Sequence, residues 1–305
     1  MRRKIAILAG GYSKEREISF STAKEVFKVL KKKYNVILID PKINLLSKLK
    51  KFKPDIVFNA LHGRYGEDGY IQSILETAKI KYTHSGVKSS SIAIDKELSK
   101  KIFKKNKILT PTGFKFQYKE ELNYNLLIKK ISKNLGYPVV LKPVNEGSSV
   151  GVFICNKSNV LRNLIKLRDF DEILVEKYIP GREIQSAILG KKAIGSIELI
   201  PKRKFYDYKA KYNKQANTKH VMPAKLSIKK YREVNRIALK AHRLLNCRGV
   251  SRSDFRFYKN KFYLLELNTQ PGMTSLSLVP EIARYINIDF NQLIEELIKD
   301  ASINK

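Results

Sequence analysis

The sequence has few cysteines and lacks a long apolar run. Its 305 residues include two cysteines, Cys155 and Cys247, too few for a disulfide framework or a cysteine metal site, so we expect a reducing, cytoplasmic location. No apolar run approaches the ~20 residues of a membrane-spanning helix, so we expect no membrane contact. The apolar residues 5–9 follow a basic start, as in a signal peptide, but they are few and run into Gly10-Gly11. We predict a first β-strand there.

Acidic residues are scarce: 28 of them stand against 61 basic residues, which gives a formal net charge of +33. One interpretation is nucleic-acid binding. However, the lysines are spread over the whole chain, and the densest runs, 28–33, 48–53 and 100–107, alternate with apolar residues at helical spacing. A basic tail, a zinc-finger motif and an RNP-like motif are all absent. We therefore predict solvated helix faces and no specific nucleic-acid partner.

Two common nucleotide-binding signatures are also missing. Gly10-Gly11 does not begin a GxGxxG motif, and the glycine-rich stretch 146–151 does not match GxxxxGK[ST]. A dinucleotide-binding fold and a P-loop are therefore not supported. With 43% hydrophobic and 29% charged residues, the chain has the composition of a globular protein of about one to three domains.

The residues before 95 alternate strand and helix patterns. Short runs rich in β-branched residues predict strands at 4–9, 35–40 and 55–61, and helical patterns occupy 15–33 and 43–51. This order is typical of a parallel sheet covered by helices. Polar loops follow the carboxyl ends of the strands, where such sheets bind ligands.

The remainder divides into two further units after a turn-rich stretch, 83–91, which we interpret as a linker. The second unit is expected to contain helices at 96–105 and 122–135 and strands at 137–142 and 150–155. The third is expected to contain strands at 183–189, 193–199, 252–258 and 261–268 and helices at 229–246 and 289–300. We therefore predict an α/β chain, α+β overall, with domains 1–94, 95–178 and 179–305.

Oxygen-bearing side chains recur in the two predicted strands 252–258 and 261–268, which a Lys259-Asn260 turn joins into a hairpin. Residues i and i+2 share a face of a strand, so Arg252 lies beside Asp254, and Glu266 lies beside Asn268. Such oxygen ligands suit Mg²⁺. The alternative is a surface hairpin with cross-strand ion pairs, and these residues alone do not decide between the two. The opposite face is expected to carry Phe255, Phe257, Leu265 and Leu267.

The loop 146–151 (EGSSVG) follows a strand that ends at Lys142. Its glycines allow backbone N–H groups to approach a phosphate, although an ordinary hairpin loop has the same composition. Lys142 ends an apolar strand, so its charge requires an anionic partner. Lys96, by its spacing alone, is expected to be solvated.

Two further segments follow predicted strands of the first unit. Ser13 is a candidate N-cap, and the charge of Glu15 is favourable at the helix N-terminus. Glu15 also lies at the carboxyl edge of the predicted strand, where it could bind the amine of a ligand. His62 precedes glycines at 63, 66 and 69, a loop suited to close approach of a ligand. A lone histidine is more often structural, and this alternative stays open.

Together these segments resemble the D-alanine–D-alanine ligases of the ATP-grasp superfamily. The matching stretches, in the family's order and over nearly the full length, are 10–19 (GGYSKEREIS), 61–69 (LHGRYGEDG), 142–151 (KPVNEGSSVG), 205–212 (FYDYKAKY), 252–254 (RSD) and 266–274 (ELNTQPGMT). The resemblance implies a Rossmann-like parallel sheet followed by two α+β subdomains that enclose ATP. It also implies ligation of two D-alanines for peptidoglycan synthesis through an acyl phosphate and a tetrahedral intermediate, with release of ADP and phosphate.

The resemblance assigns an ATP and metal site. Asp254, Glu266 and Asn268 would hold two Mg²⁺ or Mn²⁺ ions, with Glu266 bridging them. The backbone of 176–179 and Lys177 would bind adenine, and Glu183 would bind the ribose. The full set implied for the nucleotide is Lys96, Lys142, Glu146, Gly147, Ser149, Glu176, Lys177, Tyr178, Ile179 and Glu183.

The resemblance also assigns the amino-acid site. Glu15 would bind the ammonium of the first D-alanine near His62, and Arg252 with the Gly272 N–H would stabilise the oxyanion. The residues implied for closure and for the second D-alanine are Ser148, Lys211, Tyr212, Ser277 and Leu278, with 202–222 as a lid. A homodimer is implied as well. The alternatives are a depsipeptide ligase or another ATP-grasp carboxylate–amine ligase.

The 205–212 stretch generates a prediction about the product. Related depsipeptide ligases, which use D-lactate, have a different lid without the Lys211-Tyr212 pair, so we expect a dipeptide product. Phosphate release by the purified protein with ATP and Mg²⁺ at neutral pH should be faster with D-alanine than with D-lactate. Faster release with D-lactate would contradict this prediction.

Overall fold

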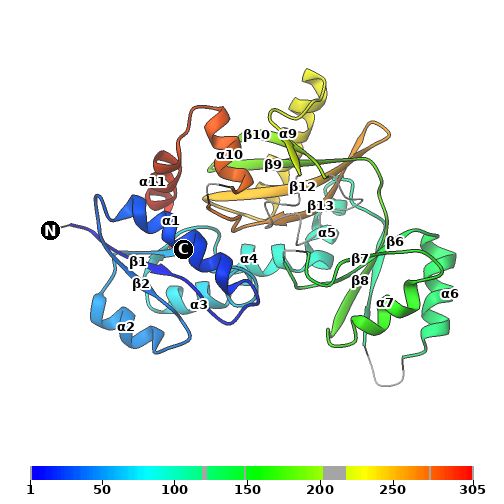
Figure 1. The fold of residues 1–305 in the computed structure, drawn as a ribbon, viewed down its shortest axis with the longest axis horizontal. Helices are drawn as coiled ribbons and strands as arrows, with labels where there is room; N and C mark the ends of the chain where they lie inside the picture. The colour runs from blue at the N-terminus through cyan, green and yellow to red at the C-terminus, as the bar shows by residue number, and fades with distance from the viewer. Residues whose placement is uncertain (1, 119–121, 148, 202–217, 275, 304–305) are drawn as a thin grey trace.

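Three β-sheets with their helices make up the residues that this computed structural model describes, 2–118, 122–147, 149–201, 218–274 and 276–303 (Figure 1). The first sheet is parallel, with the order β2-β1-β3-β4. Its strands are β1 (Lys4–Leu8), β2 (Asn35–Ile39), β3 (Ile56–Asn59) and β4 (Lys81–Tyr82), and its helices are α1 (Arg16–Leu30), α2 (Leu45–Phe52) and α3 (Tyr70–Thr77). Its central strand β1 is an almost fully buried apolar run, as expected where helices cover both faces. The predicted parallel sheet is confirmed.

The second sheet is antiparallel, with the order β5-β8-β6-β7. Its elements are β5 (Gly113–Gln117), α6 (Tyr124–Leu135), β6 (Val139–Pro143), β7 (Phe153–Cys155), α7 (Val160–Lys166) and β8 (Glu172–Lys177). The strand predicted at 150–155 begins later, because Ser149 and Gly151 have positive φ angles of 61° and 68° and turn the chain. The glycine-rich loop therefore extends to the start of β7.

The third sheet has the order β11-β10-β9-β12-β13. Its elements are β9 (Arg182–Leu189), β10 (Lys192–Ile200), β11 (Lys219–Val221), α9 (Ile228–Leu244), β12 (Val250–Tyr258), β13 (Lys261–Asn268), α10 (Leu278–Tyr285) and α11 (Phe290–Asp300). The predicted hairpin of β12 and β13 is confirmed, with Asp254 opposite Glu266.

A β-bulge in this hairpin corrects one prediction. The register shifts between the Asp254–Glu266 pair and the next one, in which Phe255 faces Leu264, so Leu265 is an extra residue. Leu265 therefore lines the same cavity as Glu266 instead of the apolar face. Phe255 and Leu267 do lie in the core, as predicted.

The predicted linker is partly wrong, because α4 (Val87–Ile94) begins within it. This helix and α5 (Lys96–Lys105) run across the middle of the molecule (Figure 1). Ala93 of α4 and Phe103 of α5 pack into the core under the third sheet, which explains why a serine-rich stretch is helical. Packing thus crosses the boundary proposed at 94/95, and that boundary and the one at 178/179 stay predictions.

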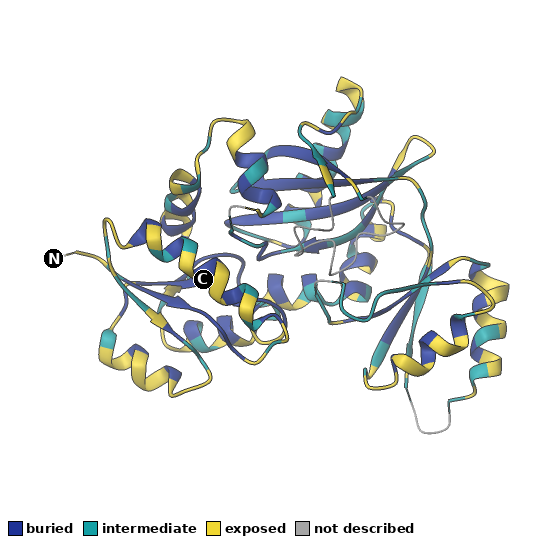
Figure 2. Ribbon diagram, in the orientation of Figure 1, coloured by how far each residue is buried: buried dark blue, intermediate teal, exposed yellow. Residues whose placement is uncertain are grey.

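Burial follows this layering: the sheets are buried, and the outward helix faces are exposed (Figure 2). The lysines of the predicted runs 28–33, 48–53 and 100–107 are exposed, which confirms solvated faces, but Lys100 is buried. Within the part of the chain that the structure describes, no helix has the length and apolar character to cross a membrane.

Phe103 tests the packing of α5 on the third sheet. Its side chain has no exposed surface, whereas Leu98 on the same helix is 42% exposed. Phe103→Ala should lower the free energy of unfolding by about 3–5 kcal/mol through the cavity it leaves. Leu98→Ala, the control, should change it by less than about 0.5 kcal/mol. Equal losses in denaturant unfolding would refute this packing.

Candidate active site

Two adjoining cavities form a cleft where loops of the first unit meet the second and third sheets. One of about 90 Å³ contains Lys142, Glu176 and Asp254, and the other, of about 80 Å³, contains Glu15, Arg252 and Gly272 among its lining residues. Lys96, Glu146 and Glu266 line both. The structure therefore brings most residues implied for the nucleotide and the first amino acid to one continuous cleft.

The oxygen cluster lies in this cleft on two neighbouring strands. Asp254 faces Glu266 across the hairpin, and Arg252 faces Asn268. The Oδ1 atom of Asn268 accepts a hydrogen bond from the Gln270 N–H at 2.7 Å, which fixes the orientation of the amide. Two carboxylates and one carboxamide are the donor chemistry that Mg²⁺ prefers, so the residues fit such an ion. Among the described residues, no group of three His, Cys, Asp or Glu side chains offers an alternative metal site.

Arg252 lies directly against this cluster. Its Nε and Nη2 atoms donate to the two carboxylate oxygens of Asp254 at 2.7 and 2.9 Å. The guanidinium also lines the cavity that contains Gly272. A fixed cation thus stands between the proposed metal ligands and the amino-acid end of the cleft.

Lys96 is buried, so the expectation that it is solvated is wrong. It is the first residue of α5, whose N-cap Asp95 accepts hydrogen bonds from the N–H groups of Glu97 and Leu98. Its ammonium donates to the carbonyls of Val144 and Glu146, and it lies 3.9 Å from the Glu266 carboxylate. Burial lowers the pKa of Lys96 despite the nearby carboxylates.

Lys142 has the anionic partner that its position requires. Its Nζ atom lies 2.7 Å from Oε2 of Glu176, and the ammonium of Lys100 binds Oε1 of the same carboxylate. Burial alone would lower the pKa of Lys142, but the carboxylates of Glu176 and Glu266 outweigh it and raise that pKa. A lysine–glutamate–lysine cluster therefore adjoins the cleft, and Lys142 and Glu176 are its members that line the cavity.

The end of β8, the connection that follows it and the start of β9 line the cleft through Lys177, Tyr178, Ile179 and Glu183. The N–H of Lys177 donates to the Thr112 carbonyl at 2.8 Å, and the N–H of Tyr178 donates to the Pro138 carbonyl at 3.1 Å. Because these two N–H groups already donate to protein carbonyls, they are not available to adenine. Adenine would have to bind other backbone groups of 176–179. Glu183 forms an ion pair with Arg256 at 3.3 Å.

Glu15 lies at the opposite end of the cleft. Helix α1 begins at Arg16, and its N-cap is Glu15. The prediction of Ser13 as the N-cap is therefore wrong by two residues. The Ser13 hydroxyl instead accepts a hydrogen bond from the Glu15 N–H at 3.1 Å. A Cβ at Gly63 would lie 2.7 Å from the Glu15 carboxylate, and φ at Gly63 is 68°. A glycine is therefore required beside this carboxylate.

His62 is buried between two polar partners. Its Nε2 atom lies 3.0 Å from the Thr22 hydroxyl, and Nδ1 lies 3.2 Å from a Glu67 oxygen. These contacts fix the ring while its edge lines the cleft. The structural and the ligand-facing interpretations of His62 are therefore compatible.

Comparisons with known proteins agree with this arrangement. Models of the D-ala D-ala ligase N-terminus and C-terminus match residues 42–85 and 102–299. A D-alanine–D-alanine ligase from Pelagibacter ubique is 59% identical, with all of both chains covered. The structure of the Bacillus anthracis D-alanine–D-alanine ligase complexed with ATP is 32% identical, with a TM-score of 0.83 and coverage of 98% of this chain and 97% of that one.

The chain belongs to the D-alanine–D-alanine ligase family. The ATP-grasp fold predicted for it is confirmed by these structures. The VanG D-Ala:D-Ser ligase of Enterococcus faecalis is also similar, at 28% identity and a TM-score of 0.83 over 98% of this chain and 99% of that one. The fold is therefore shared by ligases whose names specify different second amino acids.

Several residues that the family implies are not among those that line the two cavities, or lie outside the described residues. Ser277 is the N-cap of α10, and its hydroxyl accepts from the Thr274 N–H at 3.0 Å. The side chain of Leu278 is buried in the core, so only its backbone could contact a substrate. Ser148, Lys211 and Tyr212 lie outside the described residues.

Sequence reasoning missed several residues that hold the lining side chains of the ligase cleft in place. Lys100 and Arg256 bind the carboxylates of Glu176 and Glu183. Lys100 had one usable signal, since it follows Lys96 by four residues and so shares its helix face. Gln270, two residues after Asn268, connects that amide to Asn59 of the first unit, because Asn59 Nδ2 donates to Gln270 Oε1 at 2.8 Å.

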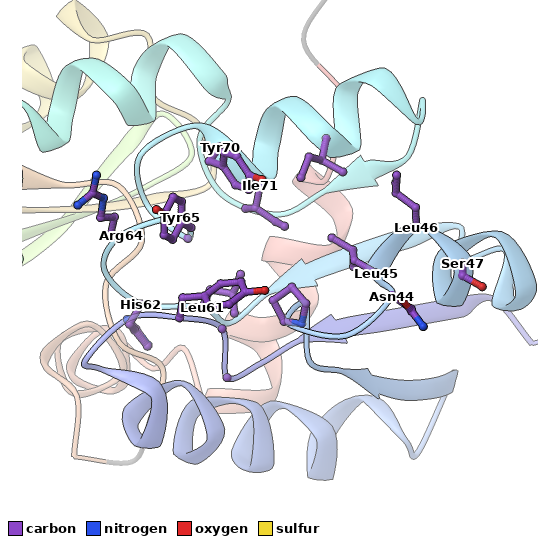
Figure 3. A pocket seen from close by; sticks show the side chains of 16 residues that line it. Asn44, Leu45, Leu46, Ser47, Leu61, His62, Arg64, Tyr65, Tyr70 and Ile71 are labelled. Atoms are coloured by element: carbon purple, nitrogen blue, oxygen red, sulfur yellow. The ribbon is translucent and has the colours of Figure 1, made fainter.

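A cavity larger than either of these two lies outside the cleft. A space of about 380 Å³ lies in the first unit between the loop after β1, the start of α2 and the loop after β3 (Figure 3). Tyr12, Tyr65 and Tyr70 line it, and His62 is the one lining residue it shares with the cleft. It contains none of the lysines or carboxylates implied for the reaction, so we assign the chemistry to the smaller, charged cleft.

Proposed function

We infer that this chain joins two D-alanines to D-alanyl-D-alanine and converts ATP to ADP and phosphate. The observation that carries this proposal is the single cleft in which buried lysines, the Asp254–Glu266 pair and Glu15 come together. The family relatives that are named D-alanine–D-alanine ligases support the same activity.

The main physical difficulty of this reaction is charge repulsion, since the carboxylate of the first D-alanine must attack a polyanionic triphosphate. Lys96 and Lys142 are assigned to the phosphates. Asp254, Glu266 and Asn268 are the residues that would hold two Mg²⁺ or Mn²⁺ ions, which when bound would neutralise the phosphate charge. The loop residues Glu146, Gly147 and Ser149 would close over the phosphates, and the product of this step is an acyl phosphate.

The second step is attack by the amine of the second D-alanine. Glu15 is assigned to the ammonium of the first D-alanine, with His62 beside it. Arg252 and the N–H of Gly272 are assigned to the developing oxyanion, and such donors contribute about 3–4 kcal/mol each. The rigid contact between Arg252 and Asp254 supports this role because the guanidinium is already oriented.

The second amino acid is assigned to Ser277 and to the backbone of Leu278, with Ser148, Lys211 and Tyr212 as the closing residues. This part of the proposal depends on the family resemblance. A ligase with another second substrate is the alternative, since a D-Ala:D-Ser ligase has the same fold. Dependence on ATP supports a cytoplasmic location, and a homodimer stays a prediction from the family.

Glu266 provides the direct test of the proposed metal site. Glu266→Ala should reduce D-alanine-dependent phosphate release at least roughly 100-fold, because an ion bound at the reacting phosphates would lose one of its ligands. Glu296→Ala is the control, since Glu296 lies on the exposed face of α11 and pairs with Lys299 there. Circular dichroism should show both variants folded. Retained turnover in Glu266→Ala would remove the metal assignment.

A further inference from the structure

Lys100 is a buried lysine in a helix whose other lysines, Lys96 excepted, are exposed. Only 4% of its surface is accessible, whereas the side chain of the adjacent Lys101 is 67% exposed. Burying an ammonium is costly unless it is paired. The position therefore has a specific role that the general abundance of lysine does not explain.

The geometry places Lys100 behind the nucleotide cavity. It lies one turn after Lys96 on α5, and its ammonium donates to Oε1 of Glu176, while Lys142 lies 2.7 Å from Oε2. Glu176 and Lys142 line the cavity, but Lys100 does not. Lys100 can therefore affect a bound nucleotide only through these two residues.

The cluster is held together by opposite charges. Glu176 is 2% exposed. Burial alone would raise the pKa of Glu176, but the two lysines lower it, so the carboxylate is ionised. Burial lowers the pKa of Lys100, and the Glu176 carboxylate opposes this shift. Lys142 and Glu176 without a third charge would form a neutral pair, with little attraction for a triphosphate.

We propose that Lys100 is a positioning residue for ATP: it engages one oxygen of Glu176, so that this carboxylate does not neutralise Lys142 and Lys142 retains positive charge for the phosphates. The inference rests on the proposed function and deepens it, since it adds a residue to the nucleotide site. A purely structural alternative is that Lys100 only connects α5 to β8.

The test measures nucleotide binding apart from turnover. Binding of ADP with Mg²⁺ and without D-alanine is followed by calorimetry for the wild type, Lys100→Met and the exposed control Lys101→Met. We expect Lys100→Met to bind ADP about tenfold more weakly and to raise KM for ATP similarly, because Glu176, no longer bound by Lys100, would then offset the positive charge of Lys142. The kcat value and KM for D-alanine should change less than about twofold, and Lys101→Met should match the wild type.

A double variant separates charge from structure. Lys100→Met with Glu176→Gln removes one positive and one negative charge, so Lys142 keeps its charge, and ADP binding should return to within about threefold of the wild type. A structural role predicts no such rescue. If Lys100→Met does not fold, Lys100→Gln, which keeps a donor toward Glu176, should show the same weakening.

The outcomes distinguish this inference from the proposed function. A wild-type protein that does not bind ADP would overturn the proposed function itself. Two outcomes would refute the proposed role of Lys100 in a wild-type protein that binds ADP. In the first, Lys100→Met binds ADP within twofold of the wild type. In the second, the double variant binds ADP no more tightly than Lys100→Met.

Discussion

Compensation of buried charge is the constraint on which the rest of this structure depends. A site for a triphosphate requires cations that are withdrawn from water, and such cations are costly unless anions stand beside them. Here Lys96 lies near Glu266, Lys142 pairs with Glu176, and Arg252 pairs with Asp254. The same pairs that make burial tolerable hold the ammonium and guanidinium groups in place before a substrate enters, which lowers the reorganisation that the reaction requires.

The three sheets meet this constraint together. The first contributes Glu15 and His62 from loops at its carboxyl edge, the second contributes Lys142 and Glu176, and the third contributes the Asp254–Glu266 pair. Helix α5 joins them, because its apolar face packs under the third sheet while its lysines reach the second. The cleft therefore exists only where all three units are assembled.

The sequence was sufficient for the parts of the fold that depend on local pattern. Alternation of strands and helices predicted the parallel sheet, the i, i+2 rule predicted the face shared by Arg252 and Asp254, and an apolar strand ending in Lys142 predicted a buried anion. The predicted face of Leu265 was wrong because one bulged residue reverses the alternation of side chains between the two faces of the strand. Helix α4 and the burial of Lys96 and Lys100 were missed because both depend on packing against segments far away in the chain.

The central claim is that Asp254, Glu266 and Asn268 bring metal and nucleotide into the lysine-lined cleft. Anomalous diffraction from crystals grown with Mn²⁺ and ADP tests it most directly. Anomalous peaks are expected within about 2.0–2.4 Å of oxygen atoms of all three side chains, next to the phosphates. Manganese bound elsewhere, with ADP outside the cleft that Lys96 and Lys142 line, would contradict it.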